Sequence, residues 1–144
     1  MTQESRTHKR KSNMKKTLIT PPGHPASRGA YSPGLLVEHG GTSTLYVTGQ
    51  LAVDPSGNVV APFDAAAQTE YVFGLIGAVL KAAGMDFADV VKVTTFLTHM
   101  PDFEKFSPVR NRYFADTKPV STLLEIKGLA KEGCCVEVEV VAVR

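Results

Sequence analysis

The sequence predicts a single domain of the α+β class, in which an antiparallel or mixed β-sheet carries two helices on one face. Three observations predict it. The C-terminal residues alternate strictly between apolar and acidic, one long segment has helical periodicity, and short β-rich runs alternate with glycine and proline turns. A chain of 144 residues with 43% hydrophobic residues can bury a core of ordinary size. No run of about 18 apolar residues occurs, so no transmembrane helix is expected.

Residues 1–20 are predicted to be a disordered basic tail or an upstream extension, with one folded domain over residues 21–144. Residues 1–16 hold six lysines and arginines against one glutamate, a net charge of +5 that leaves −3 for the rest. A basic segment poor in apolar residues cannot bury enough surface to order itself, and it lacks the apolar region of a secretory signal. Nucleic-acid affinity, targeting and an upstream start codon before Met14 remain open.

The first half of the domain is expected to contain a hairpin and a turn. Residues 21–25 read as an extended proline-rich linker. Residues 35–38 and 44–50 are short β-rich runs on either side of a His-Gly-Gly-Thr turn, which is typical of a hairpin. A second turn at residues 54–58, Asp-Pro-Ser-Gly-Asn, precedes a brief strand at residues 59 and 60.

A long helix is expected to run to Ala83, with Asp64 as its N-cap and Gly84 closing it. Its apolar stripe, which must pack on the sheet, consists of Val72, Leu75, Ile76, Val79 and Leu80. Gly74 and Gly77 each cost up to about 1 kcal/mol relative to alanine. Close approach of the helix to the sheet is the expected compensation.

The sequence of the second half of the domain predicts a central strand, a helix and two further strands. Residues 90–98 are dense in apolar and β-branched side chains, which favours a central position. Ser107 and Pro108 are the residue types of an N-cap and first helical position, so a second helix is expected from Pro108 to about Ala115. Strands follow at residues 121–126 and 136–143.

The last strand places Glu137 and Glu139 on one face and its apolar residues on the other. The wet side of an antiparallel sheet would explain such a pair. The adjacent Cys134 and Cys135 point to opposite faces if extended, so a disulfide between them would be strained. A disulfide framework is therefore excluded, and a reducing, cytoplasmic setting fits.

Four segments, in order, carry a family resemblance: Gly29-Ala-Tyr31-Ser-Pro-Gly34, Leu45-Tyr-Val-Thr48-Gly49-Gln50, the run from Val91 to Phe103, and Pro119-Val-Ser121-Thr with Val136-Glu-Val-Glu139. Together they resemble the Rid family, the YjgF-type reactive-intermediate deaminases, over about residues 25–143. The resemblance implies a chorismate-mutase-like fold assembled as a homotrimer. It also implies sites in clefts between subunits, where an imine or enamine is hydrolysed to a carbonyl compound and ammonia.

The same resemblance assigns roles to individual residues. Glu137 matches the glutamate that orients or deprotonates the attacking water, and partial burial would raise its pKa toward neutrality. Tyr31 matches a tyrosine that donates a hydrogen bond to water or substrate. Thr48 and Gly49 match residues that present backbone groups to the ligand. Glu139 could raise the pKa of Glu137 or serve as a structural carboxylate.

Two positions depart from the family pattern. Ser121 stands where deaminase-competent members have an arginine that pairs with the substrate carboxylate, and serine supplies at most one neutral hydrogen bond. Ser107 replaces an asparagine found in many members. Arg28 could bring a guanidinium to the pocket from the opposite wall, or could be a surface charge or trimer salt bridge. Arg110 and Arg112 are expected on the solvated face of the second helix.

The sequence thus favours a Rid-like hydrolase acting on a small-molecule imine or enamine with atypical substrate anchoring. A trimeric small-molecule binding or regulatory protein that has lost the chemistry is the alternative. RNA binding or cleavage is a third hypothesis, which the net charge of −3 beyond residue 16 argues against. No metal-ligand spacing and no phosphate loop occur, so neither metal nor cofactor is implied.

Overall fold

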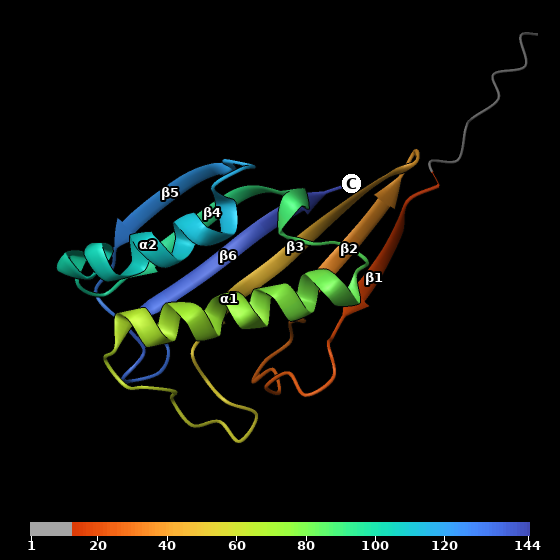
Figure 1. Ribbon diagram of the computed structural model, residues 1–144. Coiled ribbons are helices and arrows are strands. Elements are labelled where there is room, and N and C mark those ends of the chain that lie inside the picture. Colours follow the sequence, from red (N-terminus) through yellow and green to blue (C-terminus); the bar gives the residue numbers. More distant parts are fainter. Residues whose placement is uncertain (1–12) are drawn as a thin grey trace, which may run out of the picture.

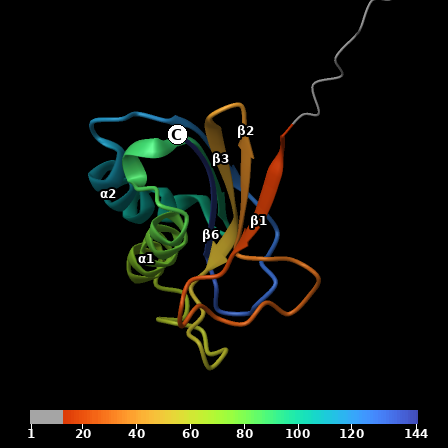
Figure 2. The ribbon, with the colours of Figure 1, turned by 90° about the vertical axis from the view of Figure 1, so that its right-hand side faces the viewer.

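Six strands form one mixed sheet in the order β1-β2-β3-β6-β4-β5, and the two helices pack on the same face (Figures 1 and 2). The computed structural model describes residues 13–144. Neighbouring strands are antiparallel except β4 and β5, which are parallel. The elements are β1 (Lys15–Ile19), β2 (Gly34–His39), β3 (Thr42–Leu51), α1 (Ala65–Ala82), η1 (Phe87–Asp89), β4 (Val90–Leu97), η2 (Met100–Asp102), α2 (Phe103–Phe114), β5 (Val120–Glu125) and β6 (Val136–Val143). The predicted α+β class with a mixed sheet and two helices on one face is confirmed.

Strand β1 corrects part of the predicted disordered tail. Residues 1–12 of that tail lie outside the described residues, but Lys15–Ile19 pairs antiparallel with β2, from Lys15 opposite Glu38 to Ile19 opposite Gly34. The side chain of Ile19 is buried in the core. The charge count over residues 1–16 concealed this strand, because the apolar and β-branched residues that form it come at the end of the basic segment.

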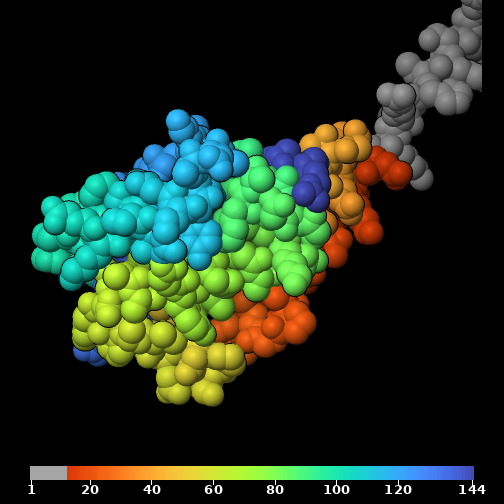
Figure 3. Space-filling view, in the orientation of Figure 1, coloured from red at the N-terminus to blue at the C-terminus, as the bar shows by residue number. Residues whose placement is uncertain are grey.

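Helix α1 forms as predicted and carries most of the core. The Asp64 side chain accepts a hydrogen bond from the Ala67 backbone N–H at 3.0 Å, and Gly84 follows the helix with φ +72°. Of the residues predicted for the apolar stripe, Leu75 is only half-buried. Phe73, which was not among them, is fully buried. Figure 3 views the covered face, where α1 and α2 hide the sheet.

The explanation expected for the two helix glycines is wrong. Gly74 is exposed, and a Cβ there would meet nothing within 4 Å. Gly77 lies against Phe87 of η1, since its Cβ would be 3.1 Å from Phe87 Cε2. The close approach of helix to sheet occurs at Gly34 of β2, where a Cβ would be 2.7 Å from Val79 Cγ1.

Helix α2 begins five residues earlier than predicted, so Ser107 is not its N-cap and Pro108 lies inside it. The turn over η2 continues directly into the helix. Pro108 lacks the N–H that would bond to the Glu104 carbonyl, but packing on α1 offsets this loss. The rings of Phe106 and Phe114 lie 6.4 and 5.7 Å from that of Phe73.

One smaller prediction also changes. The brief strand at residues 59 and 60 is only an isolated bridge between Val53 and Val59. Cys134 and Cys135 are both free and buried, directly before β6. None of the helices described between residues 13 and 144 has the length and apolar character needed to cross a membrane.

Candidate active site

Glu137 lies near the start of β6, on the face of the sheet opposite the helices, which we call the open face. The predicted alternation is confirmed, with Val136, Val138, Val140 and Ala142 buried on the helix side. Glu137 is opposite Phe96 of β4, and Glu139 is opposite Thr94. Partial burial, and then the neighbouring charge of Glu139, raise the pKa of the Glu137 carboxyl above its ordinary value. This carboxylate is therefore a stronger base than a solvated glutamate.

Gly49 makes room for that carboxylate. A Cβ at position 49 would lie 2.9 Å from Glu137 Cδ and 3.0 Å from Oε1, closer than real side chains approach. Gly49 is not among the described residues with positive φ. Space, rather than backbone conformation, is the reason for glycine here, at an irregularity in the pairing of β3 with β6.

The end of β3 is fixed by a polar network that sequence reasoning missed. Gln50 is only 3% exposed. Its Nε2 donates to the Thr48 carbonyl at 2.7 Å, and its Oε1 lies 2.8 Å from His24 Nε2. Alternation from Leu45 and Val47 predicts the next buried side chain at position 49, and the irregularity moves it to Gln50. No pattern in the local sequence indicates that shift of the buried position.

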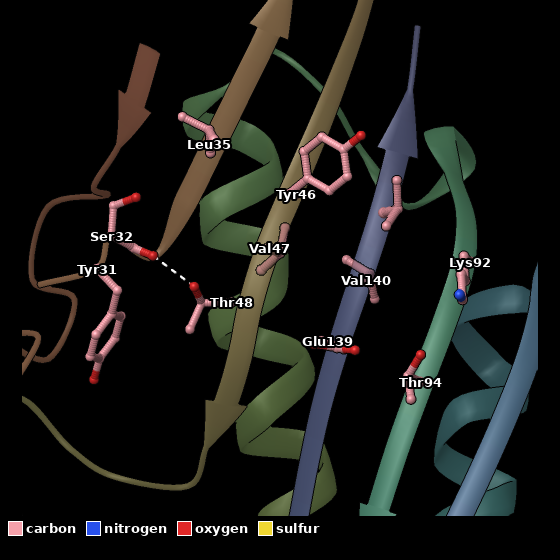
Figure 4. A pocket seen from close by; sticks show the side chains of 11 residues that line it. Tyr31, Ser32, Leu35, Tyr46, Val47, Thr48, Lys92, Thr94, Glu139 and Val140 are labelled. Carbon is pink, nitrogen blue, oxygen red and sulfur yellow. Dashed lines mark hydrogen bonds between the residues drawn. The ribbon is translucent and has the colours of Figure 1, made fainter. Parts of the chain in front are cut away.

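Thr48 ties β3 to the loop that carries Tyr31. Its hydroxyl donates to the Ser32 carbonyl at 2.7 Å (Figure 4), and its N–H donates to the Pro33 carbonyl at 2.9 Å. The Thr48 N–H and the Thr48 carbonyl, which accepts from Gln50, thus each have one partner within the chain, and a carbonyl oxygen can accept a second hydrogen bond. The bonds to Ser32 and Pro33 fix the position of the Tyr31 loop relative to β3.

Two hollows meet at Tyr31 and Thr48. One, of about 450 Å³, lies on the open face (Figure 4) and is lined by Tyr31, Ser32, Leu35, Tyr46, Val47, Thr48, Lys92, Thr94, Glu139, Val140 and Val141. The other, of about 200 Å³, includes Arg28, Tyr31, Thr48, Gly49 and Lys131 in its lining. Tyr31 is 56% exposed. Four predicted site residues, Tyr31, Arg28, Thr48 and Gly49, are thus brought together. Glu137 lies against Gly49 but lines neither hollow, whereas Glu139 lines the larger one.

Ser121 and Ser107 lie elsewhere in the same chain. Ser121 is paired with Val93, whose side chain is buried beneath the helices, so Ser121 faces the helix side of β5 while Glu137 faces the open side. A groove of about 500 Å³ between α2 and β5 contains Ser121 and Arg110. Arg110 Nη2 donates to Ser107 Oγ at 3.1 Å. The candidate residues therefore form two groups on opposite faces.

Of the two helix arginines, only Arg110 departs from prediction. Arg110 is half-buried rather than on a solvated face, and its guanidinium lies 5.7 Å from the Phe106 ring centroid. Arg112 is exposed but forms an ion pair with Glu70 of α1, so it links the two helices.

Comparisons with known proteins agree on one family. The model of the family described as Endoribonuclease L-PSP matches residues 22–144. A 2-iminobutanoate/2-iminopropanoate deaminase from Bos taurus is 35% identical over 133 residues, covering 92% of this chain and 93% of the relative. The chain belongs to the Rid family. A protein of the same name from Homo sapiens is 31% identical with the same coverage of both chains.

Solved Rid structures share the fold. A Rid family protein from Yersinia pestis has a TM-score of 0.78 and 32% identity, with 89% of this chain and 98% of that chain covered. RidA from a Psychrobacter species has a TM-score of 0.76 and 33% identity, covering 88% of this chain and 98% of that chain. The chain thus spans nearly the whole length of its Rid relatives.

In this Rid family member, a pair of cations converges next to the Tyr31 loop. A Cβ on Gly57 would lie 3.2 Å from Arg28 Nη2 and 3.7 Å from Lys131 Nζ, and Lys131 also donates to the Gly57 carbonyl. Sequence reasoning missed Lys131, which reaches the hollow from the loop between β5 and β6. No ion pair within residues 13–144 involves either cation.

The remaining chemistry-bearing groups are less suited to catalysis. Burial raises the pKa of the Cys135 thiol to about 11 and raises that of Cys134, so neither thiol is an activated nucleophile. In the part of the chain that the structure describes, no group of three or more histidine, cysteine, aspartate or glutamate residues could hold a metal ion.

Proposed function

We propose that this protein hydrolyses imines or enamines, releasing ammonia and a carbonyl compound. The observation that carries the proposal is the half-buried Glu137 carboxylate, whose pKa is raised and which packs on Gly49 next to Tyr31. Hydrolysis of a C=N bond requires such a base to remove a proton from water near neutral pH. The names of the Bos taurus and Homo sapiens relatives support the same chemistry.

The steps need only water. Glu137 accepts a proton from the water as the water oxygen bonds to the imine carbon, and it passes that proton to the imine nitrogen to give a neutral carbinolamine. Glu137 then removes the hydroxyl proton of the carbinolamine, the carbonyl forms as the C–N bond breaks, and the proton passes to the departing nitrogen, which leaves as ammonia. Tyr31 donates a hydrogen bond to the attacking water or to the substrate. Atoms and charge balance without a cofactor.

A homotrimer with sites between subunits is part of the proposal. The row of residues running across the open face is mainly apolar and consists of Leu18, Leu35, Tyr46, Val141, Lys92 and Val120. Leu18, Tyr46 and Val120 are exposed in the single chain. Contiguous exposed apolar surface of this kind usually marks a contact with another chain. Burial of this face against other copies would also enclose Glu137 further.

Substrate anchoring is atypical in this proposal, because position 121 supplies no guanidinium. Arg28 and Lys131 instead place two positive charges in the lining of the hollow next to Tyr31. An anionic substrate group could therefore be held without an arginine on β5.

The test is a direct assay. An amino-acid oxidase generates imines from aliphatic, aromatic and acidic amino acids, and ammonia release is followed with the wild-type protein and with Glu137→Gln. We expect acceleration by the wild type and its loss in the variant. Absence of acceleration for every imine, together with ligand-dependent thermal stabilisation, would instead identify a binding protein that has lost the chemistry.

A further inference from the structure

The groove between α2 and β5 is a concave surface with cations and no acid. It is lined by Val93, Arg110, Asn111, Phe114, Ala115, Lys118, Pro119 and Ser121, over a volume of about 500 Å³. Two of these side chains carry a positive charge at neutral pH and none carries a negative charge. Apolar walls beneath two cations strengthen their attraction for an anion, because less water screens them.

Arg110 is held in place within this groove. Its Nη2 donates to Ser107 Oγ and its Nε to Asn111 Oδ1, both at 3.1 Å. The guanidinium carbon lies 6.0 and 5.7 Å from the ring centroids of Phe103 and Phe106. These two bonds use two of the five N–H groups of an arginine. The other three remain available on a side chain whose orientation these two bonds favour, which lowers the entropic cost of binding a ligand.

The charge of Arg110 is also uncompensated by any carboxylate of the described chain. Other cations of the same helix are paired, Arg112 with Glu70 and Lys105 with Asp102. None of the ion pairs formed between residues 13 and 144 includes Arg110. A half-buried arginine that is oriented by neutral partners and has no counter-ion is a site for an external anion.

We propose that Arg110 binds the carboxylate of the substrate, and that Lys118 adds to the field of the groove. The inference rests on the proposed function and assigns to Arg110 the anchoring of a substrate carboxylate. The fork of a guanidinium matches a carboxylate with two parallel hydrogen bonds. Arg110 thereby supplies from α2 the cation that Ser121 does not supply from β5.

Arg110 and Glu137 lie on opposite sides of the sheet. Ser121 and the groove lie on the helix side at the β5 edge of the sheet, whereas Glu137 is on the open side of β6. Within a single chain the sheet therefore separates the two side chains. In the proposed assembly with sites between subunits, Arg110 of one copy and Glu137 of another hold the same substrate.

Arg28 is the competing anchor. Its side chain is exposed, and no hydrogen bond of its guanidinium occurs among the described residues. An exposed arginine must be ordered when the ligand binds, whereas two hydrogen bonds already orient Arg110. We therefore expect Arg110 to bind a carboxylate more strongly than Arg28 does. The affinity of the Arg28→Gln variant distinguishes between these two anchors.

The first experiment measures binding rather than turnover. The probes are 2-oxobutanoate and its amide, which differ in charge, titrated by calorimetry into the wild type, Arg110→Gln, Arg110→Lys and Arg28→Gln. Arg112→Gln removes the same charge from the same helix outside the groove and serves as the matched control. We expect Arg110→Gln to weaken binding of the acid by about 10- to 100-fold, as for loss of a charged hydrogen-bonded pair. Arg110→Lys should lose less.

The uncharged amide should bind with equal affinity to the wild type and to all four arginine variants. Equal affinity of Arg110→Gln and Arg112→Gln for the acid would overturn the inference, as would a loss confined to Arg28→Gln. Thermal melts check that each variant is folded. Ser107→Ala, which removes only the bond that orients Arg110, should give a smaller loss in the same direction.

The second experiment tests the shared site. Differently tagged Arg110→Gln and Glu137→Gln chains are co-expressed, and the mixed oligomers are isolated. In each mixed homotrimer one of the three sites combines two intact residues, because the ring is closed and symmetric, and about a third of the activity should return. No recovery, with both variants folded and mixed, contradicts the two-copy site. Absence of wild-type turnover would count against the proposed function, while the binding experiment would still decide the role of Arg110.

Discussion

The two faces of the sheet differ in how their side chains are used. On the helix-covered face the core is closed, and Phe73, Ile76 and Val93 are completely buried. On the open face Tyr46 is 51% exposed, and the two glutamates of β6 lie side by side. The difference indicates that the covered face determines stability, while the open face holds the proposed base and the surface proposed to contact another copy.

The largest expected effect is on catalysis from the open face. Glu137→Gln removes the base, and kcat/KM for imine hydrolysis should fall by about 10²- to 10⁴-fold with little change in the denaturant midpoint. Ammonia release and urea denaturation measure the two quantities. Glu132→Gln, on an exposed loop residue, is the matched control and should change neither. Retained activity in Glu137→Gln would show that Glu137 is not the base.

The covered face should respond in the opposite way. Phe73→Ala opens a cavity among the rings of Phe87, Phe106, Tyr113 and Phe114 and should lower the free energy of unfolding by about 3–5 kcal/mol. Urea denaturation measures it. Phe63→Ala deletes the same side chain from a position that is 70% exposed, so a change within about 0.5 kcal/mol is expected. Similar losses in both variants would contradict the assignment of the core.

A pair of glycines sharpens the comparison. Gly49→Ala drives a methyl group into the Glu137 side chain, so kcat/KM should fall about tenfold, with a loss of roughly 1–3 kcal/mol from overpacking. Gly74→Ala adds the same methyl group to an open helix surface and should stabilise the protein by about 0.5–1 kcal/mol without affecting activity. Thermal melts and ammonia release distinguish the two. A neutral Gly49→Ala would mean that Glu137 is free to move.

The smallest expected effect is a shift in the pH profile. In the proposed mechanism the active form of Glu137 is ionised, and its pKa is raised first by burial and then by Glu139. Activity should therefore decline on acidification at a higher pH than an ordinary glutamate would cause. Glu139→Gln removes the second cause, so the acid limb of kcat/KM should move toward lower pH. An unmoved limb in Glu139→Gln would assign the raised pKa to burial alone.

Much of the fold could be predicted because its signals are local. The period of two in β6 and the period of 3.6 in α1 are properties of neighbouring residues, as is the Asp64 cap. Strand β1 and the start of α2 were not predicted, since each depends on a distant partner: β2 for Lys15–Ile19, and the aromatic cluster around Phe73 for the turn that contains Phe103.

The candidate site divides in the same way. The sequence by itself determined the family, through its ordered motifs, and it determined that Glu137 and Glu139 share a strand face. Only the tertiary structure decided that Gly49 lies under Glu137, that Gln50 and His24 fix the end of β3, and that Ser121 faces away from Glu137. The physical reason is that the direction of a side chain relative to another strand depends on sheet order and register, which pair residues far apart in the chain. Arg110 shows this most clearly, because its groove exists only once α2 has packed beside β5.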